Sequence, residues 1–244
     1  MEKVLEVKNI YFSYEKNKDL ISDLSFEVEK NQFVSIVGSS GCGKSTIIKL
    51  ISGIYEKKSG EIIGKKTAYM PQKDLLLPWR TVLENIILPI ELEKKDLKEG
   101  KEKACSYLKR LGLLEYKDKY PYELSGGMKQ RVSFIRTLLT EAEILLLDEP
   151  FSALDAITKE NLQKWLLDVL KTFNKSVIFI THDINEALFL SDRILVCENK
   201  PLNNLKEYKI SVERKNDLKY MSFLKENILS DIGGGKYWKY HLQQ

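Results

Sequence analysis

The sequence has 244 residues, 43% of them hydrophobic, which is enough for one sizeable α/β domain with a real core. Its 39 basic and 35 acidic residues give a net charge of +4 and are spread along the chain, so nucleic acid is not an expected partner. The cysteines Cys42, Cys105 and Cys197 include no C-x-x-C pair, which indicates neither a disulfide framework nor a metal site. No chemical role is predicted for their thiols.

Hydropathy along the chain argues against a membrane-spanning or secreted protein. No apolar run reaches the roughly 18 positions that a membrane-spanning helix needs. The first nine residues alternate charged and apolar side chains, unlike a signal peptide. We therefore expect the protein in the cytoplasm.

Two kinds of β-strand are predicted. Residues 24–29 alternate between apolar and polar side chains, and residues 5–8 fit the same period, which is typical of an antiparallel sheet with one wet face. Three later runs are almost wholly apolar, as expected for parallel strands buried on both faces. These runs are 33–37, 144–147 and 177–180.

A helical block extends from about residue 81 to 139, with predicted interruptions at Gly100, Gly112 and Pro121. We expect it to be a helical subdomain inserted into a domain that covers residues 1–200. After Lys200 the pattern weakens, and residues 201–244 are predicted to be an extension of the same domain. No role is derived for the aromatic tail at 236–240.

A phosphate-binding loop is the most specific motif. It matches G-x-x-x-x-G-K-S, follows a predicted buried strand and precedes an apolar-periodic helix. Glycines let backbone N–H groups curl around phosphate oxygens, Lys44 reaches the β- and γ-phosphates, and the Ser45 hydroxyl is a ligand for Mg²⁺. The sequence therefore predicts binding of Mg-ATP. The predicted loop comprises Gly38, Ser39, Ser40, Gly41, Cys42, Gly43, Lys44, Ser45 and Thr46.

Polar residues follow two of the predicted parallel strands. Asp148 and Glu149 end the strand at 144–147, at the sheet edge where open α/β folds bind ligands. Asp148 suits the magnesium shell, and Glu149 suits the polarisation of an attacking water. His182 follows the strand at 177–180, and its position favours a contact with the γ-phosphate over a structural role.

A second anion-binding motif lies at 124–131. Ser125 is a predicted N-cap, and an apolar stripe at helical spacing follows it. Gly126 and Gly127 offer bare N–H groups at the start of the helix. The alternative is a capped core helix. Two glycines in its first turn would destabilise such a helix and bring no evident structural benefit.

Six motifs in this order resemble those of the ATP-binding-cassette ATPases, over about residues 5–201. They are the phosphate loop, Gln72, the signature at 124–130, Asp148-Glu149, the segment 152–155 and His182. The resemblance implies a P-loop NTPase core with a mainly parallel sheet, an N-terminal antiparallel β subdomain and the inserted helical subdomain.

The resemblance also implies roles for individual residues. Tyr14 would stack on adenine, with Tyr11 and Phe12 as nearby competitors. Gln72 would touch the magnesium and sense the γ-phosphate. Ser125, Gly126 and Gly127 would serve the ATP held by a second copy of the subunit.

A narrower likeness is carried by residues 75–85, 148–151 and 182–187, which are similar to the importers of nitrate, sulfonate and taurine. Ser152, where that branch usually has glycine, and Met70-Pro71-Gln72 depart from its pattern. The likeness implies a transmembrane permease, an extracytoplasmic solute-binding protein and a place on the cytoplasmic face of the membrane. Leu77, Pro78 and Trp79 are predicted to receive a helix of the permease, with burial in the chain's own core as the alternative.

Three other functions fit the sequence less well. A DNA-handling ATPase of the superfamily would carry a long coiled coil between Lys44 and Ser125, which are only 81 positions apart without sustained heptads. A non-catalytic ATP sensor would lack Glu149 or His182. A cassette of an exporter or lipid-linked transporter remains open, and so does the identity of the solute.

Overall fold

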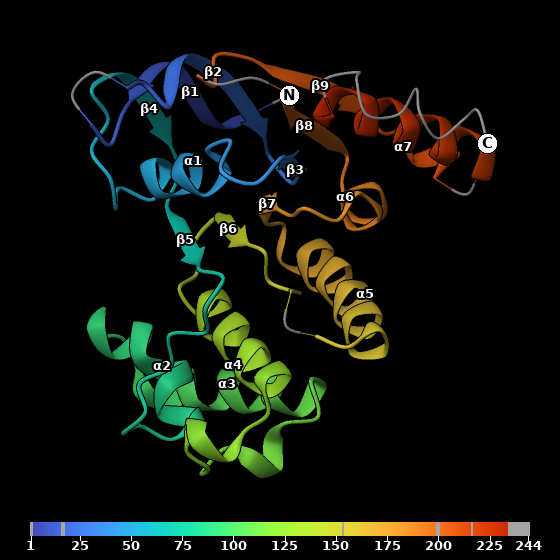
Figure 1. The fold of residues 1–244 in the computed structure, drawn as a ribbon. Coiled ribbons are helices and arrows are strands. Elements are labelled where there is room, and N and C mark those ends of the chain that lie inside the picture. Colours follow the sequence, from blue (N-terminus) through green and yellow to red (C-terminus); the bar gives the residue numbers. More distant parts are fainter. Residues whose placement is uncertain (1, 16–17, 153, 199–200, 216, 234–244) are drawn as a thin grey trace.

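The computed structural model describes residues 2–15, 18–152, 154–198, 201–215 and 217–233. Within them the chain forms an α/β core with a mainly parallel sheet, a small antiparallel sheet and a lobe of helices (Figure 1). The predicted fold class is thus confirmed. None of the helices described is both long and apolar enough to cross a membrane.

The antiparallel sheet contains the two predicted N-terminal strands. β1 (Lys3–Phe12) pairs with β2 (Ile21–Glu29) on one side and with β4 (Ser59–Gly64) on the other. Gly60 permits the close approach of β4, because a Cβ there would lie 2.2 Å from the carbonyl oxygen of Asn9. The strand β4 was not predicted.

The core sheet has the strand order β5-β6-β7-β3-β8-β9 in the described residues, with only β9 antiparallel to its neighbour. The three predicted parallel strands are confirmed as β3, β6 and β7. Their side chains alternate between two cores: Ile36 packs toward α1 and the antiparallel sheet, whereas Phe33 packs toward the helical lobe. The strands are β3 (Phe33–Gly38), β5 (Thr67–Met70), β6 (Ile144–Asp148), β7 (Ser176–Ile180), β8 (Arg193–Cys197) and β9 (Leu205–Lys209).

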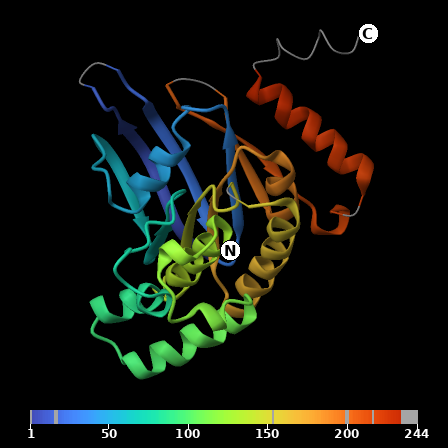
Figure 2. The ribbon, with the colours of Figure 1, turned by 60° about the horizontal axis from the view of Figure 1, so that its bottom comes forward.

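Helices cover both faces of the core sheet. α1 contacts β3, β6 and β7, whereas α6 lies between β3 and α7. Figure 2 shows α7 beside α6, on the side away from the helical lobe. A short 3₁₀ helix (Val212–Arg214) precedes α7. These helices are α1 (Lys44–Ile51), α5 (Ala156–Phe173), α6 (Ile184–Leu190) and α7 (Leu218–Ile232).

The helical lobe occupies the predicted block, but one predicted interruption is wrong. Gly100 lies inside α3, where a Cβ would come within 3.0 Å of Ile90 of α2, so the missing side chain lets the two helices pack closely. The chain breaks earlier, at Lys94 with a φ of 54°, and Asp96 caps α3. The lobe comprises α2 (Val82–Leu92), α3 (Leu97–Arg110), α4 (Gly126–Leu138) and the 3₁₀ helices Leu114–Tyr116 and Pro121–Glu123.

The C-terminal part adds β9 to the sheet and packs α7 against α6 and β8. The predicted boundary at residue 200 between domain and extension stays a prediction. The aromatic tail and His241 lie outside the described residues.

Candidate functional site

Three parallel strands deliver the predicted site residues to one edge of the core sheet. The phosphate loop follows β3, Asp148 and Glu149 end β6, and His182 comes shortly after β7. These strands are neighbours in the sheet and point the same way, so their carboxyl ends meet. That edge is where open α/β sheets bind their ligands.

The phosphate loop wraps around the ammonium of Lys44, which is only 7% exposed. Its Nζ donates to the carbonyl oxygens of Gly38, at 2.8 Å, and Ser39, at 2.9 Å. Gly43 begins α1 with a φ of 111°, and no side chain caps this helix. The first N–H groups of α1 and the ammonium of Lys44 thus create a concentrated positive potential that suits an anion. Ser39, Ser40 and Gly41 are exposed, and Cys42, Gly43, Lys44 and Thr46 are buried.

Ser45 and Asp148 form an oxygen-rich pair. The Ser45 hydroxyl donates to Oδ1 of Asp148 at 3.0 Å, and the Tyr69 hydroxyl donates to Oδ2 at 3.3 Å. Burial raises the pKa of Asp148 more than these two hydrogen bonds lower it. Hydroxyl and carboxylate oxygens suit Mg²⁺, which proteins bind with few ligands of their own and with substrate phosphates. Tyr69 was not predicted as a site residue. Its position three residues before Gln72, on a strand that runs toward the site, is the feature of the sequence that could have indicated it.

Two other predicted residues, Gln72 and His182, lie beside the carboxylate of Glu149. Its Oε2 accepts a hydrogen bond from Gln72 Nε2 at 3.1 Å and lies 3.2 Å from Nδ1 of His182. The backbone of Glu149 has a φ of 47°, a left-handed conformation that costs about 1–3 kcal/mol and occurs at functional sites. Hydrogen bonds hold this turn: Glu149 N donates to Ile180 O, and the Ser152 hydroxyl donates to Glu149 O.

Of the three aromatic residues considered for adenine, Tyr14 is the most available. It is 62% exposed, and its hydroxyl lies 2.9 Å from Oγ1 of Thr46 in the phosphate loop. Phe12 is 7% exposed and packs its ring against Tyr14 and Tyr55. Tyr11 lies within β1, opposite Ser59.

The signature residues lie at the start of α4 in the helical lobe. Ser125 caps α4 by accepting from Met128 N, as predicted. In the part of the chain that the structure describes, no hydrogen bond joins Ser125, Gly126 or Gly127 to the phosphate loop. A Cβ at Gly126 would meet nothing within 4 Å, so packing inside the chain does not require this glycine.

An ion-pair cluster that was not predicted supports the turn after β7. Lys159 of α5 contacts Asp183 at 2.8 Å and the buried Glu186 at 2.6 Å. Asp155 caps α5 by accepting from Thr158 N. The cluster ties the start of α5 to the residues that immediately follow His182.

A surface loop at residues 73–81 carries the predicted docking residues. Trp79 is 70% and Leu75 is 60% exposed, Pro78 is exposed, and Leu77 is half-buried. Core burial, the alternative for this segment, applies to Leu76, which is 9% exposed.

Asn85 of α2, which is fully buried, holds this loop in shape. Its Oδ1 accepts from Leu77 N at 2.7 Å, and its Nδ2 donates to the carbonyl oxygens of Leu77, Arg80 and Thr81 at 3.0–3.1 Å. Sequence reasoning missed this residue, which is the buried amide four positions after the Thr81 cap.

Replacing Asn85 by alanine is expected to lower the free energy of unfolding by about 1–3 kcal/mol, because the loop groups lose their buried partner. Urea denaturation followed by circular dichroism measures this change. Asn161→Ala, at an exposed position of α5, is the matched control. Equal stability of the two variants would contradict the role of Asn85.

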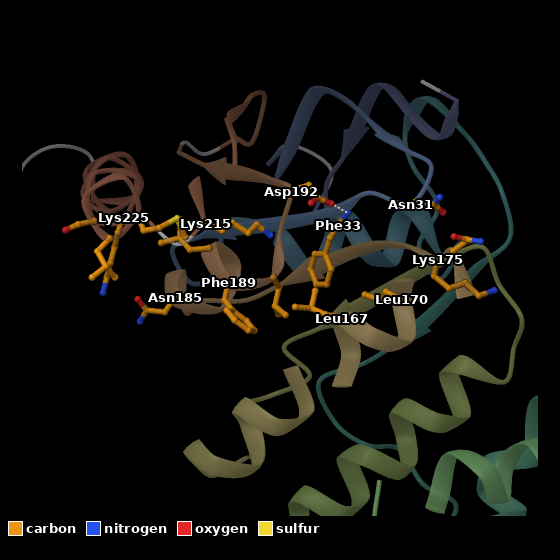
Figure 3. Close-up of a pocket in the computed structure, with 16 residues that line it drawn as sticks. Asn31, Phe33, Leu167, Leu170, Lys175, Asn185, Phe189, Asp192, Lys215 and Lys225 are labelled. Atoms are coloured by element: carbon orange, nitrogen blue, oxygen red, sulfur yellow. Dashed lines mark hydrogen bonds between the residues drawn. The ribbon is translucent and has the colours of Figure 1, made fainter. Parts of the chain in front are cut away.

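A cavity of about 870 Å³ lies at the opposite edge of the sheet. Figure 3 shows it between α5, α6, α7 and the start of β3, with Phe33 and Leu170 pointing into it. Two of its polar residues are engaged: Asp192 accepts from Phe33 N at 2.9 Å, and Lys175 Nζ donates to Ala142 O at 2.7 Å. None of the residues that line this cavity belongs to the candidate nucleotide site, so the two are separate.

The fold and the site define a P-loop nucleotide hydrolase. Comparison with known proteins identifies the family within this class, because the model of the ABC transporter family matches residues 21–152. The chain belongs to the ABC transporter family and is an ATP-binding cassette with ATPase function.

Among curated relatives, it is 42% identical to the formylaminopyrimidine import ATP-binding protein ThiZ of Halalkalibacterium halodurans, over 86% of each chain. It is 36% identical to the aliphatic sulfonates import ATP-binding protein SsuB of Bacillus anthracis, over 94% of this chain and 95% of that one. A solved relative is the ATP-binding cassette MJ0796 in a dimeric post-hydrolysis state bound to ADP and Pi. It has a TM-score of 0.76 and 27% identity, over 85% of this chain and 99% of that one.

Proposed function

We propose that this chain is the ATP-hydrolysing subunit of an importer of a small solute. The observation that carries the proposal is the convergence of Gln72, Glu149 and His182 beside the phosphate loop, in a chain whose relatives are import ATP-binding proteins. The relatives' names include a pyrimidine and aliphatic sulfonates, so this degree of similarity does not fix the solute. A nitrate-, sulfonate- or taurine-like solute is the proposal that follows from residues 75–85.

The phosphate loop binds the triphosphate through its backbone N–H groups and Lys44. On binding, the Lys44 ammonium exchanges its carbonyl partners in the loop for phosphate oxygens. Tyr14 lies beside Thr46 with its ring exposed, a suitable place for stacking on adenine. Ser45, Asp148 and Gln72 would hold Mg²⁺, which would neutralise charge on the phosphates.

Glu149 orients and polarises the water that attacks the γ-phosphate. Phosphoryl transfer depends on positioning and charge stabilisation, and the left-handed turn fixes this carboxylate at the end of β6. His182 and Gln72, both within 3.2 Å of its Oε2, report whether the γ-phosphate is present. Gln72 also immediately precedes the surface loop, so this contact links the site to the docking residues.

A second copy of the chain completes each site. Among the described residues, no hydrogen bond joins the glycines at the start of α4 to the phosphate loop of their own chain, and a Cβ at Gly126 would meet nothing within 4 Å. Because α4 has 13 residues, its glycine end lies about 20 Å from its connection to β6. The ATP-binding cassette MJ0796 is dimeric, which supports a pair here, and the proposed arrangement of that pair is head-to-tail.

The loop that carries Trp79 and Leu75 is the proposed contact with a transmembrane permease. Exposed apolar side chains on a loop that Asn85 holds rigid make a preorganised docking surface. Through this contact the subunit is held at the cytoplasmic face of the membrane. An extracytoplasmic solute-binding protein completes the proposed assembly.

Replacing Trp79 by glutamate tests this coupling. The purified Trp79→Glu protein should hydrolyse ATP like the unmodified protein, but its fraction in the membrane pellet of the producing cells should fall several-fold, because a charge is costly in an apolar interface. Sedimentation and steady-state ATP hydrolysis measure the two properties. Phe223→Glu on α7 is the matched control, since Phe223 is 61% exposed and lies outside the loop. Equal membrane fractions for both variants would place docking elsewhere, and no ATP hydrolysis by the unmodified chain would refute the function.

A further inference from the structure

Two cysteines for whose thiols the sequence predicted no chemical role lie close together at the phosphate loop. Cys42 belongs to the loop and is 2% exposed, and Cys197 ends β8 and is 1% exposed. They are far apart in the sequence, but β3 and β8 are neighbours and Gly38 is directly opposite Cys197. The fold therefore brings the two side chains to the same end of the sheet.

Gly38 shows how close the two cysteines are. A Cβ on Gly38 would lie 2.8 Å from Cβ of Cys197 and 3.0 Å from Sγ of Cys42. Both side chains thus flank one point that only the missing side chain of glycine leaves open.

The surroundings make the two sulfurs chemically unequal. A hydrogen bond from the Cys197 thiol, together with the Lys44 ammonium 3.8 Å from Sγ, lowers the pKa of Cys42. The same hydrogen bond and burial raise the pKa of Cys197. Cys42 is therefore the sulfur of the pair that forms a thiolate more readily.

We propose that Cys42 is an oxidation site for hydrogen peroxide, with Cys197 as its resolving partner, and that the resulting disulfide blocks nucleotide binding. Two buried cysteines are often only small apolar side chains in a core. The close approach at Gly38, with a lysine beside one sulfur, goes beyond what packing requires. In reducing compartments, disulfides are usually transient and redox-sensing, which is the use that this pair fits.

The chemistry balances with peroxide as the oxidant. The Cys42 thiolate attacks one peroxide oxygen, the O–O bond breaks, and a sulfenic acid and hydroxide form. The Cys197 sulfur then attacks the sulfenic sulfur, forming the S–S bond, and its proton leaves with the displaced oxygen as water. Two thiols lose two electrons and one peroxide becomes two waters. Small cellular thiols reverse the step by exchange.

The disulfide would distort the phosphate loop. A bond of about 2 Å between the sulfurs draws Cys42 toward β8. Its neighbours move with it, because Cys42 N is held in a tight turn by Ser39 O at 3.3 Å. The N–H groups of the loop then no longer converge on a phosphate. A misplacement of about 1 Å can reduce turnover about 100-fold.

The experiment treats the purified full chain with a small excess of hydrogen peroxide and maps its cysteines by mass spectrometry. We expect a peptide pair linked through Cys42 and Cys197, an about 100-fold loss of ATP hydrolysis that dithiothreitol restores, and protection by Mg-ATP, which draws Lys44 away from the sulfur. Binding of a fluorescent ATP analogue should fall in parallel, with unchanged circular dichroism.

Two variants sharpen the test. Cys105→Ser, which removes the half-buried cysteine of α3, should behave like the unmodified chain. Cys197→Ser should keep its basal activity and accumulate a sulfenic acid at Cys42 that dimedone traps, without a cross-link. Oxidation that gives no linked pair, or a linked pair that binds nucleotide normally, would overturn the proposal. The loss of nucleotide binding rests on the proposed function, whereas the mapped disulfide does not, so the two can fail separately.

Discussion

Lys44→Ala is expected to reduce steady-state ATP hydrolysis about 10²–10³-fold, the loss typical of removing one preorganised donor from a developing charge. Lys44 is the cation enclosed by the phosphate loop, and its ammonium is within 2.9 Å of two loop carbonyls. Without Lys44, the loop keeps its backbone N–H groups but loses the unit positive charge of the ammonium. The measurement is phosphate release at saturating Mg-ATP, with a fluorescent nucleotide to follow binding.

Lys164→Ala is the control for this substitution. Lys164 lies on α5 and forms an exposed pair with Glu160, one turn away. Exposed pairs of this kind contribute little, so this variant should retain full turnover and stability. Normal turnover in the Lys44→Ala protein would refute the assignment of residues 38–46 as the phosphate loop.

The central strands could be predicted from the sequence because they are buried on both faces. The sheet edge that carries the candidate site could be predicted from the same strands. Almost wholly apolar runs at 33–37, 144–147 and 177–180 can be recognised without knowledge of their partner strands, and each leads directly into a polar motif. The convergence of Glu149 with His182 then follows from parallel strand direction alone. The roles of the individual residues stay predictions, since a shared edge brings groups together without showing what they bind.

The edge strands and the tertiary contacts could not be predicted from the sequence. β4 contains two glycines and β9 contains three charged residues among five, so neither shows a period that identifies a strand. Gly100 was predicted to end a helix, but its lack of a side chain serves the packing of α3 against Ile90. Similarly, Tyr69 and Asn85 have a role only through partners that the fold brings to them.

A mixed-subunit experiment tests the composite site most sharply. All proteins carry Glu149→Gln, so that bound ATP persists. One protein then carries Lys44→Ala and a first affinity tag, and the other carries Ser125→Arg and a second tag. Arginine at the N-cap of α4 removes the hydrogen bond to Met128 N and places a large side chain over the bare glycine N–H groups. Each protein alone has two defective sites per pair and should stay monomeric with ATP.

The mixture differs from either protein alone because the two defects sit on opposite halves of a site. In a head-to-tail pair, one interface receives both defects, while the other joins an intact phosphate loop to an intact signature. ATP should therefore allow purification through the first tag to recover the second tag, and omission of ATP should abolish the recovery. The γ-phosphate explains this dependence, because two anion-binding helix starts repel each other unless the phosphates lie between them. The Glu149→Gln protein without further changes sets the full signal. If that protein dimerises readily while the mixture recovers nothing, each site is completed within one chain, and Gly126 then needs a different explanation.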